Sequence, residues 1–539
     1  MKDFAKVFLF LLILLSIHAL GVTGKAFFDL NANGVFDNDE KGLAGCLISD
    51  GKVILSTDDQ GTFSLDTDQP FVFVILPDGY TYTNRWYAST KESEIHFGLT
   101  KCVCNGVFAV VADLHYAENP EIFSQALKDR SMKYCADEYM EKLVRNLSEI
   151  HPSFVIVLGD LGASVRDISD ELAQGQLLRV KNYMNRIGTD VFYAVGNHEF
   201  NSKIQRPVGI YEDIFGPRYY SFNRCGAHFV VLDTHSSANG SLIYGIDDMQ
   251  LDWLKNDLTL VRDDQRIIVL SHEPLYDLAD SENNRALRKM FVDLRITAHI
   301  SGHWHSMIRL SDYPYLQLTC GAVSGAWWEG PSPTGDEFGY TLFEMDRNSL
   351  NYAYIHITDE PSVWFEFPLD GILSGIVPFR IVTSKFLQQP TVSIDGSKLS
   401  IQPIVIIRKS WTEYVYYLNV SYLDKGVHDL ILEDSESAIR KARSFWVDNR
   451  FVTFEQMKDY AECFQGRLVT VVGAKPVAKY GSSVSFHDGT DGLMVKMSSS
   501  EIVRRLADTT TYNLTGIAKD PWATAEPLRI YLDEGLIQK

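Results

Sequence analysis

Short apolar runs recur along residues 105–345, and each ends in polar residues. Five of the runs are typical of buried β-strands because they are four or five residues long and rich in Val, Ile and Phe. They are Val107–Val111, Phe154–Leu158, Val191–Val195, Ile267–Leu270 and Ile296–Ile300. Apolar residues recur at helical spacing over Asp137–Ile150, Glu171–Ile187 and Asp248–Val261, which predicts amphipathic helices. Strands that alternate with helices predict an α/β domain.

The segments on either side of this region have a different pattern. Short strand-like runs alternate with turn residues from residue 25 onward, and helical periodicity fades beyond about residue 350, as in all-β modules. A chain of 539 residues is also too long for one core. We expect a signal peptide at 1–24, a β-sandwich at 25–98, the α/β domain at 99–350, a β-module at 351–448 and an OB-like β-barrel at 449–539.

Residues 1–24 have the pattern of an export signal. Two lysines flank the apolar stretch Val7–Ile17, and small residues follow at Gly21 and Gly24. The stretch is shorter than the ~20 residues that span a membrane, so we predict a signal peptide cleaved after Gly21 or Gly24. An uncleaved anchor is the alternative. We expect a periplasmic or secreted protein, or one held at the cell surface.

Each of the five strands is followed by residues that can bind a metal. They are Asp113-Leu114-His115, Gly159-Asp160, Gly196-Asn197-His198-Glu199, His272 and Gly302-His303-Trp304-His305. Ligands in open α/β sheets bind past the carboxyl ends of strands, so the five segments should meet at one edge. Carboxylate and imidazole donors suit divalent Mn, Fe or Zn, and two such ions ~3.5–4 Å apart clamp a phosphoryl group. One motif alone is more typical of a turn or a core histidine, so the prediction depends on their joint order.

The order of these motifs resembles the calcineurin-like metallophosphoesterase family. The family pattern is D-x-H, G-D, G-N-H-[DE], a single H and G-H-x-H, and all five motifs occur here in that order within residues 105–345. The resemblance implies an α/β/β/α sandwich for the catalytic domain, flanked in this chain by all-β domains. The chain as a whole also resembles the multidomain, exported bacterial members of this family, which have N- and C-terminal β-modules.

The resemblance implies a role for each motif residue. The first metal would be held by Asp113, His115, Asp160 and His305. The second would be held by Asp160, Asn197, His272 and His303, so Asp160 would bridge the two ions. The catalytic residues would be Asn197 and His198, of which His198 faces the phosphate without binding metal.

The leading hypothesis is an exported phosphoesterase dependent on two metal ions. It would hydrolyse phosphomono- or phosphodiesters by attack of a metal-activated hydroxide. The accessory β-modules favour an alternative, a cell-surface binding or scaffold protein with an inactive phosphoesterase domain. The complete ligand set favours the enzyme, because an inactive domain has no chemical reason to keep every ligand.

Charge and composition limit the partners. The net charge of −20 repels nucleic-acid backbones, so we expect a phosphoester substrate and no broad nucleic-acid binding. The β-modules favour contact with the cell envelope or with carbohydrate.

The seven cysteines lack the spacing of a disulfide framework, and we expect most to be buried and inert. In an oxidising compartment, pairing of Cys102 or Cys104 with Cys135 is one hypothesis. Substrate, metal identity and oligomeric state are not determined by the sequence.

A loop near the N-terminus has the spacing of a calcium site, D-x-N-x-N-G-x5-E. Its oxygen donors fall at Asp29, Asn31, Asn33, Val35 (through the carbonyl) and Glu40. The flanks are strand-like, so the loop is not a helix-loop-helix EF-hand. It is similar to the B-type repeats of bacterial surface adhesins. Bound Ca²⁺ and an ion-free turn are both compatible with the sequence.

Overall fold

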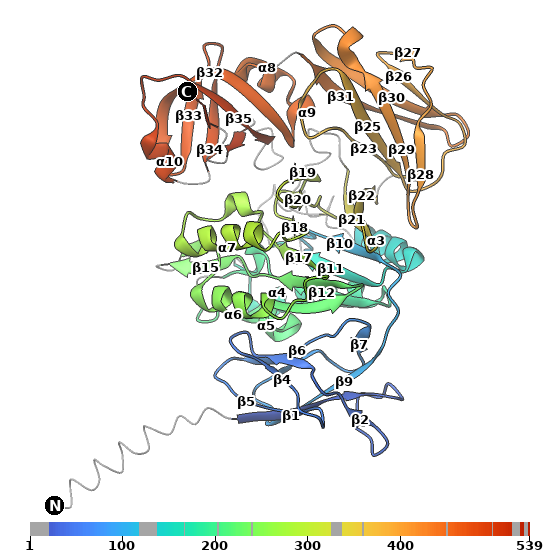
Figure 1. Ribbon diagram of the computed structural model, residues 1–539, viewed down its shortest axis with the longest axis vertical. Coiled ribbons are helices and arrows are strands. Elements are labelled where there is room, and N and C mark those ends of the chain that lie inside the picture. The colour runs from blue at the N-terminus through green and yellow to red at the C-terminus, as the bar shows by residue number, and fades with distance from the viewer. Residues whose placement is uncertain are drawn as a thin grey trace, which may run out of the picture. The chain divides into compact units, whose positions relative to one another are not determined.

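The computed structural model describes residues 21–117, 137–166, 168–201, 204–238, 241–324, 337–357, 361–448, 451–497, 500–519, 529–532 and 537–538. The chain forms two compact units, whose helices and strands are labelled in Figure 1. The first unit consists of the chain up to Val103 together with two later segments, Tyr220–Arg224 and Asp248–Asp263. The second holds the remainder. Most of the predicted signal peptide lies outside the described residues, and so does Cys135. None of the helices described combines the length and the apolar character needed to cross a membrane.

The first unit contains two β-sheets. One has the strand order β2-β1-β9-β7, with β5 also paired to β1, and the other has the order β4-β3-β6-β8. The strands are β1 (Gly21–Phe28), β2 (Lys41–Gly42), β3 (Leu47–Ser49), β4 (Ile54–Ser56), β5 (Thr62–Asp66), β6 (Phe71–Ile75), β7 (Tyr80–Tyr82), β8 (Tyr87–Ser89) and β9 (Glu94–Lys101). In β5 the buried Phe63 and Leu65 alternate with exposed residues, as in a sheet with one face on the core.

The sheet begins before residue 25, the predicted start of this module. Residues Gly21 to Lys25 pair with β5, and Val22 is 1% exposed. A cut after Gly24 would remove buried residues from the sheet, whereas a cut after Gly21 leaves them in place. At the other end β9 continues to Lys101, past the predicted boundary at residue 98.

Two segments inside the predicted α/β domain belong to the first unit. They are β13 (Tyr220–Arg224) and α6 (Asp248–Leu258). The backbone N–H of Asn223 in β13 donates to the carbonyl of Leu76 at 2.9 Å. The buried indole of Trp253 in α6 donates to Ser49 Oγ at 3.1 Å. The unit is therefore not one continuous stretch of chain, which the sequence pattern did not predict.

The second unit is built around two sheets that carry the five motif strands. Their strand orders are β12-β11-β10-β21-β22 and β14-β17-β18-β20-β19. The bounds are β10 (Val107–Val111), β11 (Phe154–Leu158), β12 (Asp190–Ala194), β14 (Ala227–Val231), β17 (Arg266–Ser271), β18 (Ala298–Ser301), β19 (Ile308–Ser311), β20 (Leu316–Thr319), β21 (Gly339–Met345) and β22 (Leu350–His356). The rings of Phe108 and Phe154 lie 5.4 and 5.1 Å from the Phe229 ring of the other sheet, so the sheets pack face to face.

Helices cover the outer faces of this sandwich (Figure 1). The helices and the small hairpin are α3 (Asp137–Ile150), α4 (Asp170–Asn185), η2 (Asn197–Glu199), α5 (Gly209–Phe215), β15 (His235–Ala238), β16 (Ser241–Tyr244), η3 (Leu275–Asp277) and α7 (Glu282–Asp293). α4 begins behind Ser169, whose hydroxyl accepts from the N–H of Leu172. Phe291 of α7 packs on His299 of β18. The arrangement is the α/β/β/α sandwich expected from the sequence.

Residues 361–448 form a module of two sheets with the orders β23-β25-β29-β28 and β24-β31-β30-β26-β27. The bounds are β23 (Val363–Glu366), β24 (Ile372–Leu373), β25 (Ile376–Thr383), β26 (Pro390–Ile394), β27 (Ser397–Lys398), β28 (Ile404–Ile407), β29 (Thr412–Asn419), η4 (Val420–Tyr422), β30 (Gly426–Asp434) and β31 (Ile439–Val447). Phe379 and Phe445 lie in one shared apolar core, with ring centroids 5.2 Å apart.

The last module contains a closed barrel. β32 pairs with both β33 and β35, which closes five strands in the order β32-β33-β34-β36-β35. The bounds are α8 (Phe454–Asp459), α9 (Ala461–Phe464), β32 (Arg467–Tyr480), β33 (Ser483–His487), β34 (Gly492–Met497), α10 (Ser500–Arg505), β35 (Tyr512–Lys519), β36 (Arg529–Leu532) and β37 (Ile537–Gln538). The three short helices were not predicted from the sequence. Apart from these helices, β-sheets flank the catalytic sandwich along the chain, as expected.

One disulfide joins Cys104 to Cys225, at a sequence separation of 121. The hypothesis that Cys104 pairs with Cys135 was therefore wrong, because Cys225 is the partner of Cys104. Cys46, Cys320 and Cys463 are buried thiols, in line with the expected inert cysteines.

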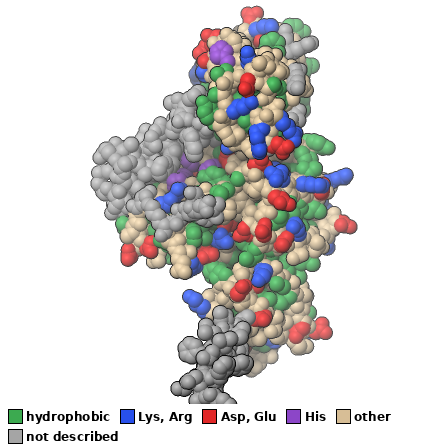
Figure 2. All heavy atoms as spheres, turned by 90° about the vertical axis from the view of Figure 1, so that its left-hand side faces the viewer, with side chains coloured by type: hydrophobic (Ala, Val, Ile, Leu, Met, Phe, Trp, Pro, Cys, Tyr) green, Lys and Arg blue, Asp and Glu red, His purple; other side chains and the backbone are tan. Residues whose placement is uncertain are grey.

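Figure 2 shows one face of the molecule. On the described part of this face, acidic, basic and apolar side chains are interspersed. The chain as a whole carries a net charge of −20. Positive side chains that gather in one place are therefore informative in this protein.

Candidate metal centre

Every predicted ligand segment follows a strand of the two central sheets. Asp113 and His115 follow β10, and Asp160 follows β11. Asn197 follows β12, His272 follows β17, and both His303 and His305 follow β18. β10, β11 and β12 are parallel neighbours, and so are β17 and β18, so the carboxyl ends of each set lie at one sheet edge.

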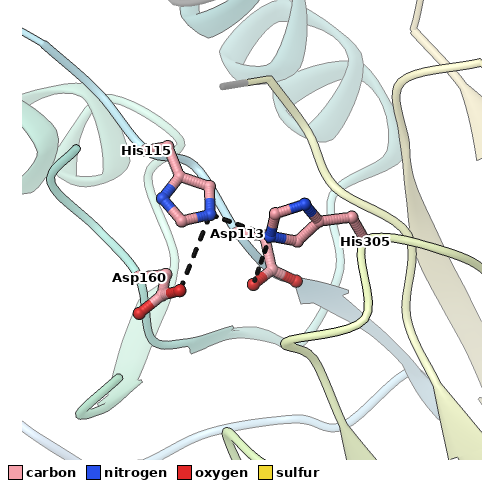
Figure 3. Close-up of side chains that lie close together, drawn as sticks. All are labelled: Asp113, His115, Asp160 and His305. Atoms are coloured by element: carbon pink, nitrogen blue, oxygen red, sulfur yellow. Dashed lines mark hydrogen bonds and ion pairs between the residues drawn. The ribbon is translucent and has the colours of Figure 1, made fainter. Parts of the chain in front are cut away.

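The structure gathers the charged ligands into two clusters that share Asp160. In each cluster one nitrogen or oxygen atom per residue lies within 4.8 Å of the others. The first cluster contains Asp113, His115, Asp160 and His305 (Figure 3). The second contains Asp160, His272 and His303. Six of the seven predicted ligands therefore lie in the clusters, in the two groups that the family resemblance implies.

In the first cluster the donor atoms point toward one another (Figure 3). His115 Nε2 lies 2.9 Å from His305 Nε2 and 3.6 Å from Asp160 Oδ2. His305 Nε2 lies 3.6 Å from Asp113 Oδ1. Two ring nitrogens and two carboxylates facing one small volume form a donor set for a divalent cation.

In the second cluster the seventh predicted ligand completes the set. His272 Nε2 lies 3.2 Å from Asp160 Oδ2 and 3.1 Å from the amide oxygen of Asn197. His303 Nδ1 lies 3.2 Å from the same nitrogen. Asn197 is thus beside the second cluster, where a neutral oxygen ligand adds no negative charge.

Hydrogen bonds on the far side of the ligands fix their orientation. His272 donates from Nδ1 to the carbonyl of Leu158 at 2.7 Å, which leaves Nε2 directed at the cluster. The backbone N–H of His303 donates to the Asp113 carboxylate at 3.0 Å, which links the first strand motif to the last. Contacts of this kind set the tautomer and ring angle of metal-binding histidines.

The backbone at the site is strained. Five of the seven predicted ligands have a positive φ: Asp113 (53°), His115 (42°), Asp160 (49°), His303 (66°) and His305 (52°). A non-glycine residue in this conformation costs of order 1–3 kcal/mol and persists only where the surroundings impose it. Strain concentrated on the predicted ligands indicates that their positions matter more than local backbone stability.

Two motif glycines are required by close approach. A Cβ atom on Gly196 would lie 2.2 Å from the backbone nitrogen of Asp160. A Cβ atom on Gly159, which has a φ of +82°, would lie 2.7 Å from Gly196 Cα. The two ligand loops can therefore touch only because both residues lack a side chain.

Glu199 holds the second motif loop, a role that the sequence analysis did not assign. Its buried carboxylate accepts the backbone N–H groups of Asp160, Leu161 and Gly196 at 2.9 Å each, and that of Gly162 at 3.1 Å. Burial and the nearby charge of Asp160 raise the pKa of Glu199 to about 7, while the backbone hydrogen bonds oppose that rise. The final residue of the G-N-H-E motif is thus a positioning residue.

His198 lies beside the clusters and outside both. Its Nδ1 donates to the carbonyl of Ala163 at 2.5 Å, so Nε2 faces Asp160 Oδ2 at 4.0 Å. The backbone N–H of His198 donates to the other oxygen of that carboxylate at 2.9 Å. The imidazole therefore presents Nε2 to the edge of the centre, where a phosphoryl oxygen or a leaving alcohol could meet it.

Burial and mutual charge separate the pKa values in the centre. Burial, with the charge of Asp160 added, raises the pKa of Asp113 well above its usual range. Burial acts the same way on Asp160, but nearby histidines, His272 foremost, hold the pKa of Asp160 well below its usual range. Burial lowers the pKa of His303 to about 4 and that of His115 well below its usual range. Neutral imidazoles and an ionised carboxylate are the forms that bind metal.

Two further side chains near the centre lie outside the motifs. Arg166 donates from Nη2 to the carbonyl of Asn197 at 3.0 Å. The ring of Tyr244, on β16, lies 5.5 Å from the ring of His303. A cation and a phenol at this edge suit an anionic substrate. The sequence did not distinguish Arg166 and Tyr244 from surface residues, because neither belongs to one of the five motifs that follow the strands.

The predicted calcium loop closes through its own hydrogen bonds. Asp29 Oδ2 accepts from the N–H of Gly34 at 2.7 Å, and Glu40 Oε1 accepts from the N–H of Leu30 at 2.8 Å. The Asn33 side-chain oxygen accepts from the N–H of Val35 at 2.7 Å, and the Asn31 oxygen accepts from the N–H of Asn33 at 3.0 Å. These oxygens accept hydrogen bonds from the backbone of the loop, and calcium binding remains a prediction.

Comparisons with known proteins agree with the motifs. The family model for calcineurin-like phosphoesterase matches residues 106–307, and the model for the N-terminal domain of calcineurin-like phosphoesterase matches residues 30–101. A solved dimetal phosphatase from Danio rerio is similar at 19% identity and a TM-score of 0.34, over 46% of this chain and 95% of that one. GAP50, the anchor in the inner membrane complex of Plasmodium, is similar at 17% identity and a TM-score of 0.34, over 48% and 86% of the two chains.

A third solved structure, Vps29 of Entamoeba histolytica in complex with Zn²⁺, is similar at 10% identity and a TM-score of 0.22, over 47% of this chain and 99% of that one. The two family models cover the first β-module and the motif strands of the central sandwich in turn. With the five motifs and the two donor clusters, they show that the chain belongs to the calcineurin-like phosphoesterase family.

Proposed function

We propose that this protein is an exported, metal-dependent phosphoesterase that hydrolyses phosphomono- or phosphodiesters. The observation that carries the proposal is the pair of donor clusters that share one carboxylate, Asp160. Membership of a generally hydrolytic family supports it. Charged substrate would meet the half-buried Arg166 at the edge of the same centre.

The donor set fits two divalent ions of the Mn, Fe or Zn class. The clusters contain carboxylate and imidazole groups and no thiolate, which is the set expected for such ions at an open site. Asp113, His115, Asp160 and His305 would hold one ion, and Asp160, Asn197, His272 and His303 would hold the other. When bound, the ions would supply a hydroxide at neutral pH and a positive field on the phosphoryl group.

The residues around the ions have separate tasks in this proposal. Asp160 supplies one carboxylate to both clusters and is held in place by Glu199 and the N–H of His198. Asn197 orients a phosphoryl oxygen through its amide. His198 keeps Nδ1–H on the Ala163 carbonyl, so Nε2 is the atom that assists the departing alcohol.

Export is the second part of the proposal. Residues 1–24 supply the signal, and the start of β1 at Gly21 favours a cut after that residue because Val22 is already buried in the sheet. Fractionation of the producing cells and sequencing of the mature N-terminus test it. We expect a first residue of Val22 in the exported fraction; a chain that stays in the cytosol contradicts this part.

Hydrolysis is tested with the purified full chain and two chromogenic esters, p-nitrophenyl phosphate and bis-p-nitrophenyl phosphate, with Mn, Zn, Fe and Mg supplied in turn. We expect turnover of at least one ester that a chelator abolishes. Asp160→Asn and His198→Ala should each lower the rate by at least about 100-fold. His96→Ala is the matched control, because this partly exposed histidine belongs to the first unit and to neither donor cluster.

The outcomes separate the enzyme from the scaffold alternative. Tight binding of about two transition ions per chain, with activity that follows them, supports the enzyme. No turnover with any of the four metals supports the scaffold. Full activity in both Asp160→Asn and His198→Ala would reject the roles assigned to these two residues, although the protein would still be a hydrolase.

A further inference from the structure

Tyr244, on the small hairpin β15–β16, lies beside the second donor cluster. Its ring centre is 5.5 Å from that of His303, and the two rings meet edge to face. The side chain is half-buried. We propose that the hydroxyl of Tyr244 donates a hydrogen bond to a non-bridging oxygen of the substrate's phosphoryl group. This contact rests on the proposed function, because it adds one more residue to the same centre.

The hydroxyl of Tyr244 is available to a ligand. The ring packs against His303 and His235, and within the described part of the chain the hydrogen bonds of this residue are made by its backbone. The hydroxyl oxygen is also not one of the buried polar atoms that lack a partner, so water or a ligand can reach it. An accessible O–H group on a packed ring is suited to donate to an incoming acceptor.

The electrostatic surroundings place this phenol near the shared carboxylate of the two clusters. Burial raises the pKa of Tyr244 most, and the charges of Glu273 and Asp160 raise it further. Asp160 is therefore within electrostatic reach of the hydroxyl. A phenol keeps its proton at neutral pH, since its ordinary pKa is about 10, so the group can donate to an anionic ligand.

The backbone of Tyr244 is fixed from two directions. Its carbonyl accepts from the N–H of Ala279 at 2.8 Å and from the side-chain amide of Asn284 at 3.3 Å. Asn284 is 1% exposed and also donates to the carbonyl of Ala279 at 2.8 Å. The N–H of Gly245, the next residue, donates to the carbonyl of Thr234 at 2.7 Å. A donor that is fixed before the ligand arrives needs little reorganisation to act on it.

A buried network ties the hairpin to the second donor cluster. His235 is opposite Tyr244 in the hairpin. Its Nδ1 lies 2.8 Å from Asp233 Oδ1, and its Nε2 lies 2.8 Å from Glu273 Oε1. His235, Asp233 and Glu273 are all buried, and Glu273 directly follows the predicted ligand His272. The position of the phenol is therefore set by the same segment that supplies a metal ligand.

Tyr244 and His198 approach the centre beside different clusters. The ring of His198 lies 4.6 Å from that of His115, a residue of the first cluster, whereas Tyr244 packs on His303 of the second. A phosphoryl group held between the clusters would be contacted from both sides. Since His198 is assigned to the departing alcohol, the phenol is left for a non-bridging oxygen, where a neutral donor stabilises developing negative charge.

Phosphate binding tests the contact without turnover. Isothermal titration calorimetry is done on the full chain loaded with Mn²⁺ or Zn²⁺, with inorganic phosphate as the probe. Tyr244→Phe removes the hydroxyl and keeps the ring, so phosphate affinity should fall by about tenfold while the metal content stays at the wild-type value. Tyr313→Phe is the matched control, because Tyr313 is 87% exposed between β19 and β20 of the same sandwich. Its phosphate affinity should equal that of the wild type.

Ester hydrolysis and elemental analysis give two further readouts. The kcat/KM for p-nitrophenyl phosphate should fall by at least about tenfold in Tyr244→Phe and stay unchanged in Tyr313→Phe. Tyr244→Ala, which also removes the packing on His303, should in addition weaken metal binding.

The outcomes separate this contact from the proposed function. Equal phosphate affinity in Tyr244→Phe and Tyr313→Phe overturns the proposal, and so does a metal-loaded wild type that binds no phosphate. Loss of metal in Tyr244→Phe also overturns it, because the phenol would then act through packing alone. A chain that binds phosphate as expected but hydrolyses no ester would reject the proposed function and support the contact.

Discussion

At the scale of single residues, several side chains of the candidate centre are oriented by a second contact through the same side chain or its backbone. His272 is held through Nδ1 and His198 through the Ala163 carbonyl. The sequence could supply the identity of the donors, because five motifs follow five apolar runs. It could not identify the residues that orient these donors. Leu158 and Ala163 act through their backbone carbonyls, which every residue type has, so their side chains give no signal in the sequence.

Glu199 offers a direct test of such positioning. Glu199→Gln replaces one acceptor oxygen with an N–H₂ group that faces backbone donors, so the loop of Asp160 should loosen. We expect metal affinity to fall by about 10–100-fold, with activity recovered at high metal concentration. Metal titration with elemental analysis measures it. An unchanged affinity, or a loss of activity that excess metal does not restore, would argue against a positioning role.

A surface ion pair in the β-module gives a pH prediction. His428 Nδ1 lies 2.6 Å from Asp395 Oδ2, and Nε2 lies 2.8 Å from the carbonyl of Asp424. Burial works against the charged form, but these hydrogen bonds raise the pKa of His428. Burial likewise opposes the change at Asp395, where hydrogen bonds from the Asp429 N–H and from His428 lower the pKa.

The stabilisation from this pair should be complete between about pH 3.9 and pH 6.5, the ordinary pKa values of Asp and His. It is lost as pH rises through the raised pKa of His428, and also as pH falls through the lowered pKa of Asp395. His428→Gln should therefore lower the melting temperature by about 2 °C at about pH 5.5 and by less at about pH 8.5. A difference that does not vary with pH would contradict this.

At the scale of elements, the strands of the central sandwich were predictable because they are covered on both faces and are continuous apolar runs. β10 and β11 coincide with their predicted ranges, and so does α3, whose buried stripe has helical spacing. The helices α8, α9 and α10 were not predictable, because four to six residues are too few for periodicity to appear. The recruitment of β13 and α6 by the first unit was also hidden, since contacts distant in sequence leave no local pattern.

The barrel contacts the last metal-binding loop through one aromatic pair. Trp304 stands between His303 and His305, and its ring lies 5.0 Å from the ring of Tyr531 on β36, within a buried apolar cluster. Tyr531→Ala should cost about 3 kcal/mol of stability and should weaken metal binding, because the loop loses its packing partner. Denaturant unfolding and metal titration measure both effects. Tyr422→Ala, at a site 86% exposed, is the control and should change neither.

At the scale of the whole molecule, the disulfide closes a long stretch of the second unit. Cys104 and Cys225 are separated by 121 residues, and closing so large a loop restricts the unfolded chain. The sequence could not identify this pairing, because seven scattered cysteines allow many partners and the two residues meet only in the fold.

Removal of the disulfide should therefore destabilise the chain by about 2–5 kcal/mol. Thermal melting of the double variant Cys104→Ser, Cys225→Ser measures the loss. A reductant should lower the melting temperature of the wild type toward that of the variant and leave the variant unchanged. Equal melting temperatures for both proteins under oxidising conditions would show that the bond contributes nothing to stability.

The first strand that the structure describes, β1, is paired in parallel with β9, with Thr23 opposite Glu94 and Phe28 opposite Leu99. During synthesis the earliest residues of β1 must therefore wait until β9 has left the ribosome. No shorter nascent fragment can complete that sheet, and the wait extends further because β13 and α6 arrive later still. Folding of the first unit therefore begins only after residues distant in sequence have all been synthesised, and the export proposed above would deliver them together.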